Sequence, residues 1–178
     1  MIISLTGFMG CGKSSVGRIL SQLLCCRFMD LDSVIETSEG RSIPEIFASD
    51  GESHFRSLEK TVLSGIISAD SERSIAPEEK LVLALGGGTV MTPECAELVH
   101  ENTLCIYLQA SLETLISHLE SEASGRPLLS GKDLRDRISE LMAKRSATYE
   151  NTAHVIIDTD GRSIDSIAQE IRDTQNSD

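Results

Sequence analysis

The stretch GFMGCGKS, from Gly7 to Ser14, decides how the surrounding sequence folds. It matches the pattern GxxxxGK[ST], in which successive backbone N–H groups of a glycine-rich loop surround a phosphate. The apolar run Ile2 to Thr6 precedes it, and a helical pattern from Val16 to Leu24 follows it. A chance glycine-rich turn would have no reason to lie between a strand and a helix. The stretch therefore predicts a phosphate-binding loop whose phosphate meets the positive end of the helix.

Two side chains of this loop are suited to a nucleoside triphosphate. Lys13 is expected to reach the β- and γ-phosphates, and the hydroxyl of Ser14 is expected to bind one Mg²⁺ ion. The residues predicted to contact the nucleotide along the loop are Gly10, Cys11, Gly12, Lys13, Ser14 and Ser15. The loop thus predicts ATP as the ligand and Mg²⁺ as the cofactor.

Further apolar runs follow the one that precedes the loop. Each is short and rich in aliphatic or β-branched residues, which is typical of buried parallel strands. These runs are Arg27 to Leu31, Leu81 to Leu85, Thr103 to Leu108 and Val155 to Ile157. Helical patterns separate them, and this alternation predicts a three-layer α/β fold. At 178 residues the chain is expected to form one domain over 1–178.

The helical patterns between the runs carry apolar stripes that are expected to pack on the sheet. The stripes are Phe55, Leu58, Val62 and Ile66; Leu112, Leu115, Ile116 and Leu119; Leu134, Ile138, Leu141, Met142 and Tyr149; and Ile164, Ile167, Ala168 and Ile171. Arg145 also lies on the third stripe, where a cation on the buried side needs a partner. Two polar stretches that contain proline, Ala69 to Lys80 and Ser121 to Lys132, are expected to be irregular.

The composition argues against several function classes. Sixteen Lys and Arg against 28 Asp and Glu give a net charge of −12, which would repel a nucleic-acid backbone. Five cysteines without a CxxC spacing suggest neither a disulfide framework nor a zinc site.

No apolar run is long enough to cross a membrane and no signal peptide precedes the first strand, so we expect a cytoplasmic protein. With no long exposed apolar stripe, we expect a monomer.

A second magnesium ligand is expected outside the loop, because the strand Leu81 to Leu85 ends in glycines rather than in an acid. Asp30 and Asp32 close the second strand with a spacing of two, which places both carboxylates on one side of an extended chain. One could bind the metal and the other a substrate hydroxyl. The alternative is a capping pair for a helix that begins near Ser33.

The glycines Gly86, Gly87 and Gly88 stand at the carboxyl end of a predicted strand. They leave the backbone bare, so a ligand the size of a sugar ring could approach it at the edge where α/β sheets bind ligands. The alternative is a tight turn that requires positive φ angles.

Three arginines are candidates for binding anions. Arg56 has Glu59 one turn later on the same helical face, and Arg145 lies on an apolar stripe. The two could converge on a planar anion such as a carboxylate, although Arg56 could equally form an ordinary surface pair. Arg126 follows a glycine in the second polar stretch, where it could close over the phosphates or lie in solvent.

Several motifs beyond the phosphate-binding loop lie in the order and near the spacing of the shikimate kinases. They are Asp30-Leu31-Asp32, GRSIPEIF (Gly40 to Phe47), GESHFRSLE (Gly51 to Glu59), LALGGGTV (Leu83 to Val90), RPLL (Arg126 to Leu129) and KRSATYENTAHVIIDT (Lys144 to Thr159). Over nearly its whole length the sequence therefore resembles the shikimate kinase family.

The resemblance implies both an activity and a fold. The activity is the ATP-dependent phosphorylation of the 3-hydroxyl of shikimate, a step of aromatic amino-acid biosynthesis. The fold is similar to that of the nucleoside monophosphate kinases, with a five-stranded parallel sheet ordered 2-3-1-4-5. The resemblance further implies a lid at about 121–132 and substrate-binding helices at about 33–68.

The resemblance assigns residues to the phosphate side of the reaction. Ser14 and Asp30 would bind the magnesium ion, while Lys13 and Arg126 would neutralise charge on the transferred group. Arg126 would do so from the lid.

The resemblance also assigns residues to the acceptor side. Asp32 would meet the hydroxyl that receives the phosphoryl group, and Arg56 and Arg145 would hold the carboxylate of shikimate. The backbone of Gly86 and Gly87 would contact the ring. The expected catalytic residues are Lys13, Asp32 and Arg126.

The sequence departs from the family pattern at two places in the nucleotide site. Many relatives have an arginine that stacks on adenine about where this chain has His118-Leu119-Glu120, and Arg162 is our substitute candidate for that contact. Cys11 stands where a small Ala or Ser is usual, and beside Lys13 and a helix N-terminus its thiol is expected to be reactive.

Two other functions remain open at this point. The first is a kinase of the same architecture that acts on another small hydroxy acid, such as gluconate. The second is a nucleotide-binding module without turnover, although the polar residues that catalysis would need are present.

Overall fold

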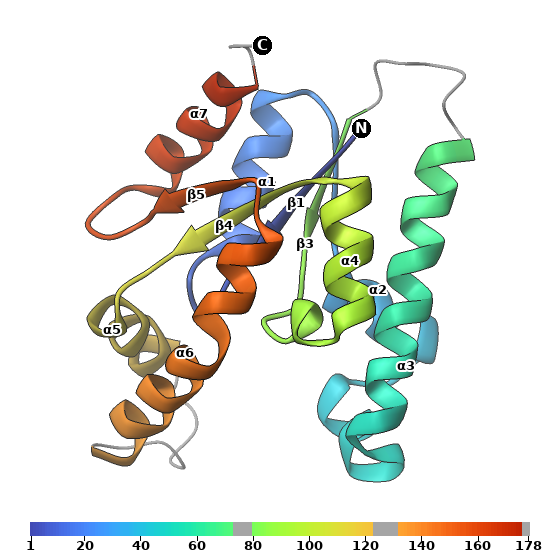
Figure 1. Ribbon diagram of the computed structural model, residues 1–178, viewed down its shortest axis with the longest axis horizontal. Helices are drawn as coiled ribbons and strands as arrows, with labels where there is room; N and C mark the ends of the chain where they lie inside the picture. The colour runs from blue at the N-terminus through green and yellow to red at the C-terminus, as the bar shows by residue number, and fades with distance from the viewer. Residues whose placement is uncertain (73–79, 123–131, 176–178) are drawn as a thin grey trace.

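The structure, a computed structural model, describes residues 1–72, 80–122 and 132–175. Its centre is a sheet of five parallel strands in the order β2-β3-β1-β4-β5, which confirms the predicted fold class and strand order (Figure 1). The strands are β1 (Ile2–Thr6), β2 (Arg27–Asp30), β3 (Leu81–Ala84), β4 (Leu104–Gln109) and β5 (Val155–Asp158). Leu5 of β1 pairs with Ala84 on one side and with Ile106 on the other, so the three central strands run in register.

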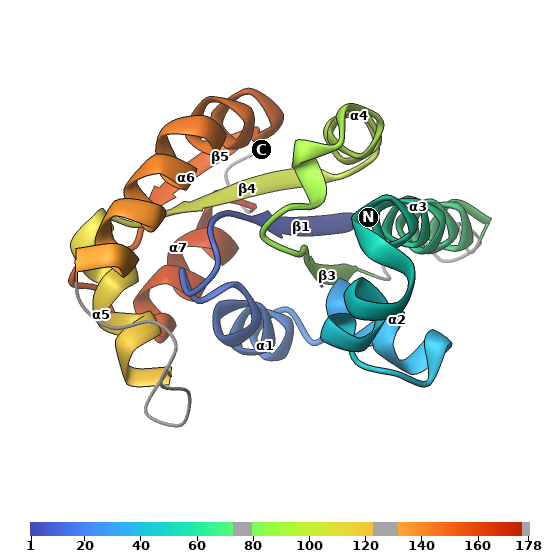
Figure 2. The ribbon, with the colours of Figure 1, turned by 90° about the horizontal axis from the view of Figure 1, so that it is seen from below.

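Helices cover both faces of the sheet, as expected for parallel strands joined by crossover connections. They are α1 (Lys13–Leu23), α2 (Leu31–Glu39), α3 (Ile43–Glu72), the short 3₁₀ turn η1 (Thr89–Met91), α4 (Pro93–Asn102), α5 (Leu112–Glu122), α6 (Lys132–Thr152) and α7 (Ile164–Thr174). Figure 2 shows α4 and α6 on one side of the sheet and α1 and α7 on the other. The chain therefore forms three layers.

The core is built around β1, whose five residues are all buried. A continuous cluster of apolar side chains extends from β1 through the neighbouring strands to the helices on both faces. The stripes of α5 and α6 contribute to this cluster as predicted, and so does most of the stripe of α7. Ile164, at the start of α7, is an exception because it is 41% exposed.

The buried face of α3 differs from the predicted one. In the part of α3 that carries the predicted stripe, the fully buried positions are Phe55, Glu59, Leu63 and Ile67. Most of the predicted stripe, namely Leu58, Val62 and Ile66, is only partly buried. These side chains pack against the core as predicted, but the predicted stripe leaves out Glu59, whose buried carboxylate has polar partners of its own.

Several boundaries also differ from the sequence-based expectation. The long helix α3 bends at Gly51, where φ is 81°, and then continues to Glu72, into a stretch predicted to be irregular from Ala69. The residues from Ala69 to Glu72 contain neither Gly nor Pro, so nothing in them stops a helix. Residues 73–79 of that stretch and most of the predicted lid lie outside the described residues.

The end of β2 matters most for the site. The strand ends at Asp30 and α2 begins at Leu31, so Asp32 belongs to the first helical turn. The prediction that Asp30 and Asp32 both lie on the strand was wrong, because the carboxylate of Asp30 caps the helix and turns the chain.

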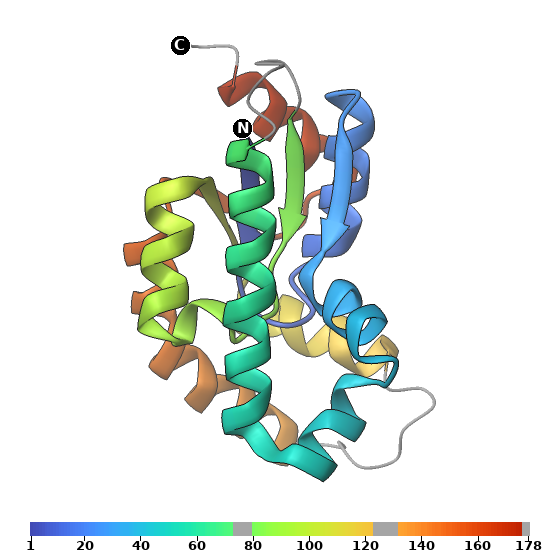
Figure 3. The ribbon, with the colours of Figure 1, turned by 90° about the vertical axis from the view of Figure 1, so that its right-hand side faces the viewer.

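The carboxyl ends of the strands face one end of the molecule. Figures 1 and 3 show the strand arrows pointing towards the end where α2, α5 and the first turns of α3 lie. This edge is where parallel α/β sheets bind ligands. Within the described parts of the chain, no helix is both long enough and apolar enough to cross a bilayer.

Candidate active site

The phosphate-binding loop lies between β1 and α1, as predicted. Gly12 adopts φ 93° immediately before α1, a backbone conformation that disfavours any residue with a side chain. Lys13, the first residue of the helix, is 9% exposed. Its ammonium donates hydrogen bonds to the carbonyl oxygens of Gly7 and Phe8, each at 2.9 Å. The loop therefore closes around the amino group of Lys13.

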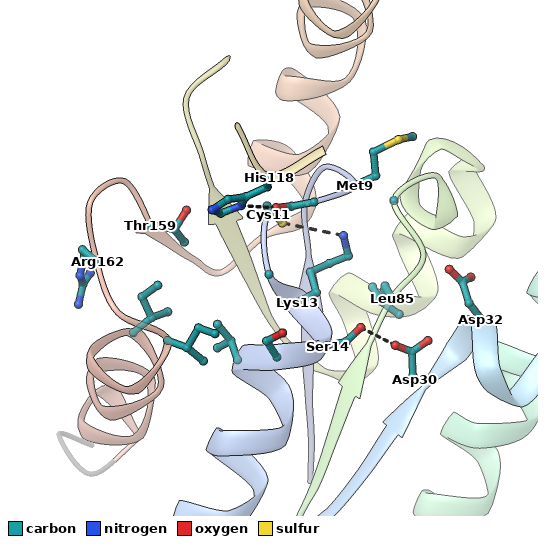
Figure 4. Close-up of a pocket in the computed structure, with 17 residues that line it drawn as sticks. Met9, Cys11, Lys13, Ser14, Asp30, Asp32, Leu85, His118, Thr159 and Arg162 are labelled. Carbon is teal, nitrogen blue, oxygen red and sulfur yellow. Dashed lines mark hydrogen bonds between the residues drawn. The ribbon is translucent and has the colours of Figure 1, made fainter. Parts of the chain in front are cut away.

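A cavity of about 450 Å³ opens in front of this loop (Figure 4). Lys13 and Ser14 lie at its centre, Asp30 and Asp32 on one side, and Arg162 on the other. The lining residues are Met9, Gly10, Cys11, Gly12, Lys13, Ser14, Ser15, Val16, Asp30, Asp32, Leu85, Gly87, His118, Thr159, Arg162, Ile164 and Ile167. The cavity thus brings together most of the residues predicted to bind the nucleotide and metal.

Ser14 and Asp30 form the group suited to a metal. The Ser14 hydroxyl donates to Oδ2 of Asp30 at 2.6 Å, while Oδ1 of Asp30 accepts the backbone N–H of Ser33 at 3.3 Å. Asp30 therefore caps α2, as one of the two alternatives predicted, and its other carboxylate oxygen faces the loop; its binding of magnesium stays a prediction. A hydroxyl and a carboxylate are the hard oxygen donors that Mg²⁺ prefers, so the pair fits this ion.

Asp32 lies next to the glycines that follow β3. A methyl group at Gly86 would lie 2.7 Å from its Oδ1, so the absence of a side chain there makes room for the carboxylate. Burial raises the pKa of Asp32 to about 6, with further contributions from the charges of Asp30 and Glu59 and an opposing one from Lys13. The group is placed to exchange a proton near neutral pH.

Glu59 holds Arg56 in place from inside the protein. Its side chain is 1% exposed, and its Oε2 accepts a hydrogen bond from Nη1 of Arg56 at 2.7 Å. The other oxygen, Oε1, accepts the hydroxyl of Thr89 at 2.6 Å. Glu52 offers Arg56 a second, longer contact of 3.5 Å from an exposed position. Arg56 is therefore not an ordinary surface pair.

The glycines after β3 fit closely against the groups around them. A methyl group at Gly88 would lie 2.7 Å from Nη2 of Arg56, so only glycine leaves space for this guanidinium. A methyl group at Gly87 would lie 3.2 Å from the backbone nitrogen of Met9. The glycine segment therefore touches Arg56 on one side and the phosphate-binding loop on the other.

Arg145 reaches the same segment from α6. Its Nη1 lies 3.4 Å from the carbonyl oxygen of Gly87, and its guanidinium carbon lies 5.9 Å from the centre of the Phe8 ring. Tyr149, one turn further along α6, donates its hydroxyl to the same Gly87 oxygen at 2.5 Å. Arg56 and Arg145 thus approach the glycine segment from two different helices.

The far side of the cavity holds His118 and Arg162. The Nδ1 of His118 lies 2.8 Å from the carbonyl oxygen of Gly10, and because a carbonyl only accepts, this nitrogen carries the proton. Arg162 lines the cavity, but its guanidinium also donates to the Asp158 carbonyl oxygen at 3.1 Å and pairs with Glu170 at 2.5 Å. Its contact with adenine stays a prediction.

Two predicted residues need separate mention. Arg126 lies outside the described residues, so its predicted role over the phosphates stays a prediction. Cys11 is 4% exposed, and its Sγ lies 3.9 Å from Nζ of Lys13. Cys11 also lines the cavity, and the reactivity of its thiol stays a prediction.

Sequence reasoning missed three residues that contact this site. Thr89, Tyr149 and His118 each make a hydrogen bond to a predicted site residue or to its partner. A weak signal existed for Tyr149, which lies one turn after Arg145 on the same stripe. Nothing in the local sequence marks Thr89.

Known proteins resemble this chain over almost its entire length. The family model described as shikimate kinase matches residues 9–176. The shikimate kinase of Geobacter metallireducens is 41% identical over 169 residues, which cover 95% of this chain and 88% of that protein. The shikimate kinase of Thermus thermophilus is 38% identical over 169 residues, which cover 95% of this chain and 86% of that protein.

Solved structures agree with these sequence matches. The structure of the shikimate kinase from Acinetobacter baumannii in complex with shikimate has a TM-score of 0.85 and 33% identity, covering 99% of this chain and 93% of that one. The crystal structure of the shikimate kinase from Aquifex aeolicus has a TM-score of 0.79 and 28% identity, covering 99% and 96%. Because the family model and relatives of 38% and 41% identity match almost the whole chain, the chain belongs to the shikimate kinase family.

Proposed function

We propose that this chain phosphorylates shikimate at its 3-hydroxyl with ATP bound at the Gly7–Ser14 loop and shikimate bound at the glycine segment. The observation that carries the proposal is the contact between these two regions. Gly87 lies against Met9 of the loop, and Asp32 lies beside Gly86. A phosphoryl group held by the loop would therefore be close to a hydroxyl held by the glycine segment.

The proposed acceptor, shikimate, has a carboxylate and hydroxyl groups on its ring. The site offers partners for the carboxylate and for the reacting hydroxyl. Two guanidinium groups, from Arg56 and Arg145, are suited to binding the planar carboxylate. Asp32 is suited to accepting a hydrogen bond from the reacting hydroxyl. Because Glu59 and Gly88 fix Arg56 from two sides, the carboxylate would be held in one position relative to Asp32.

Phosphoryl transfer then depends mainly on position and charge. The hydroxyl oxygen of shikimate forms a bond to the γ-phosphorus, and the bond from that phosphorus to the β–γ bridging oxygen breaks. ADP carries away the electron pair, and the hydroxyl proton passes to the carboxylate of Asp32 or to water. Lys13 would stabilise the charge that develops on the phosphate oxygens, and we assign the same role to Arg126.

Magnesium has a defined place in this proposal. Ser14 and Asp30 would hold the ion, together with phosphate oxygens of ATP. The bound ion would supply positive charge to the phosphates.

Activity measurements test the assignment directly. ADP release is followed in the presence of Mg²⁺ and ATP, with shikimate, quinate, gluconate or no acceptor, and Lys13→Ala serves as the inactive control. We expect turnover with shikimate that is absent without an acceptor and absent in the Lys13→Ala variant. Turnover with gluconate but not shikimate would assign the arginines to another anion, and ATP binding without any turnover would favour a nucleotide-binding module.

A further inference from the structure

The backbone of the glycine segment has its carbonyl groups occupied by protein donors. The Gly86 oxygen accepts the N–H of Thr89 at 3.2 Å, and the Gly88 oxygen accepts the N–H of Met91 at 3.0 Å. The Gly87 oxygen accepts the Tyr149 hydroxyl at 2.5 Å and lies 3.4 Å from Nη1 of Arg145. All three acceptors of the segment are therefore satisfied internally.

The amide N–H groups of the same segment differ from its carbonyl groups in their hydrogen bonds. Among the described parts of the chain, no hydrogen bond takes up the N–H of Gly86, Gly87 or Gly88. Backbone donors are rarely left without a partner when no solvent or ligand can reach them. Because Gly87 lines the cavity, the segment is arranged to offer donors to a ligand whose oxygens accept hydrogen bonds.

The Gly87 carbonyl differs from its two neighbours in how it is held. The Gly86 and Gly88 oxygens are fixed by the N–H groups of the η1 turn, which immediately follows them. The Gly87 oxygen depends on side chains of α6, 58 and 62 residues further along the chain. The peptide between Gly87 and Gly88 can also rotate at little cost, because neither residue has a Cβ. A rotation would turn the carbonyl away from α6 and reverse the direction of the Gly88 N–H.

We propose that Tyr149 is a positioning residue for the acceptor, because its hydroxyl fixes the Gly87 carbonyl against α6 and so keeps the segment's donors directed at the bound substrate. This inference rests on the proposed binding of shikimate at the glycine segment. A carbonyl turned into the site would face oxygen atoms of the acceptor, which are themselves hydrogen-bond acceptors. Loss of the hydroxyl would therefore weaken shikimate binding and leave the ATP site intact.

The surroundings of Tyr149 suit this task. Its side chain is 1% exposed, and its ring stacks on Tyr107 with the two ring centres 5.2 Å apart. Burial raises the pKa of Tyr149 to about 12, so the hydroxyl keeps its proton and remains a donor throughout the neutral range. The ring is held by packing, and only the hydroxyl reaches the glycine segment.

The test compares two variants that each remove one phenolic hydroxyl. Tyr149→Phe removes the bond to Gly87 and the hydrogen bond of the same hydroxyl with Arg145, so the KM is read together with the backbone measurement below. Tyr107→Phe removes a hydroxyl from the neighbouring stacked ring, which is 4% exposed. For Tyr149→Phe we expect the KM for shikimate to rise about tenfold, with the KM for ATP within about twofold of the unmodified protein. For Tyr107→Phe we expect both values within about twofold. An unchanged shikimate KM in Tyr149→Phe would overturn the proposal, and so would equal changes in both KM values or in both variants.

A second measurement does not depend on which acceptor is used. The amide resonance of Gly88 reports the peptide that contains the Gly87 carbonyl, and it can be followed by NMR without substrates. We expect it to shift or broaden in Tyr149→Phe and to stay unchanged in Tyr107→Phe. An unchanged Gly88 resonance in Tyr149→Phe would overturn the proposal. If the unmodified protein does not use shikimate but the resonance moves, the proposed function fails while the role of Tyr149 in holding the segment stands.

Discussion

The two halves of the site are built in different ways. The phosphate half comes from consecutive residues between β1 and α1, and its geometry follows from backbone conformation and a single lysine. The acceptor half comes from α2, α3, α6 and the glycine segment, which are far apart in the sequence. Its geometry follows from side chains that hold distant groups, as Glu59 holds the side chain of Arg56 and Tyr149 holds the backbone carbonyl of Gly87.

The difference teaches which part of the molecule can change independently. A local loop depends on few distant contacts, so substitutions elsewhere should leave it in place. An assembled site depends on each of its supports, so a substitution behind the substrate should affect substrate binding. The halves meet where Gly87 touches Met9, and a variant that affects one half should leave the other measurable.

The largest effect is expected in the phosphate half. Lys13 is 9% exposed and lies at the centre of the cavity. Lys13→Met removes its positive charge and keeps most of the aliphatic side chain. We expect kcat to fall by about a thousandfold or more, because in the proposed mechanism this charge would stabilise the transferred group in the transition state. Calorimetric titration with shikimate should give an affinity within about threefold of the unmodified protein. A parallel loss of shikimate affinity would show that the two halves are not independent.

The next effect is expected at Arg56 in the acceptor half. Arg56→Lys keeps a positive charge but loses the planar pair of donors. We expect the KM for shikimate to rise by about 30- to 100-fold, with the KM for ATP nearly unchanged, in steady-state assays. Arg135→Lys is the matched control, since Arg135 pairs with Glu113 at an exposed position away from the cavity. A rise in the KM for ATP equal to that for shikimate would contradict the separation of the halves.

A smaller effect is expected from the support behind Arg56. Glu59→Gln keeps the shape of the side chain but removes the buried charge that holds Nη1 of Arg56. We expect the KM for shikimate to rise by about tenfold, since a neutral amide holds a guanidinium less firmly. Glu52→Gln is the control, because Glu52 also contacts Arg56 but has a side chain that is 70% exposed. Equal effects of the two substitutions would remove the argument that burial makes Glu59 the important partner.

The same contrast between local and assembled structure explains what could be predicted from the sequence. The phosphate half was predictable because a strand, a glycine-rich loop and a helix occur in succession. The strand order followed from the family resemblance, and the chemistry of Arg56 and Arg145 identified both as anion-binding candidates. Their supports were not all predictable, because Thr89 reaches Glu59 across 30 residues and Tyr149 reaches Gly87 across 62.

Two differences between the predictions and the structure have physical explanations. The stripe on α3 was assigned from apolar residues alone, and it missed that a paired carboxylate such as Glu59 can be buried. Asp32 was assigned to the strand from its spacing to Asp30. The spacing does not reveal that Asp30 accepts a capping bond from Ser33, which starts the helix at Leu31. The contact of Glu59 with Thr89 is tertiary, whereas the capping bond at Asp30 is local.

Asp32 lies between the halves, and its effect is expected in stability as well as in activity. Because folded Asp32 has a pKa of about 6 instead of 3.8, it retains its proton to higher pH than the unfolded chain does. The folded state therefore loses stability as pH rises between these two values, and the loss is complete above about pH 6. We expect Asp32→Asn to raise the free energy of unfolding at pH 8 by about 1–2 kcal/mol, after allowance for solvent screening, and to change it much less at pH 4.5.

Denaturant titrations at the two pH values measure this change. In the unmodified protein, kcat/KM for shikimate should rise with pH as Asp32 loses its proton, and this rise should be absent in Asp32→Asn. Equal stability changes at both pH values would show that the substitution acts through packing and not through the charge.

The smallest effect is expected from a substitution on α3 outside the site. This substitution tests whether the acceptor half depends on its own contacts or on the stability of the helix that carries Arg56. A methyl group at Gly65 would have no neighbour within 4 Å, so Gly65→Ala adds helix propensity without a clash. We expect the free energy of unfolding to rise by about 0.5–1 kcal/mol, measured in denaturant, with the KM for shikimate unchanged.

Gly17→Ala provides the opposite case within α1. A methyl group there would lie 2.5 Å from the ring of Phe28, so the same substitution should destabilise the protein because the ring must move. If Gly65→Ala instead altered the KM for shikimate, the position of Arg56 would depend on the stiffness of α3 as a whole. An unchanged KM would place the control of Arg56 in its immediate partners, Glu59 and Gly88, as the contacts indicate.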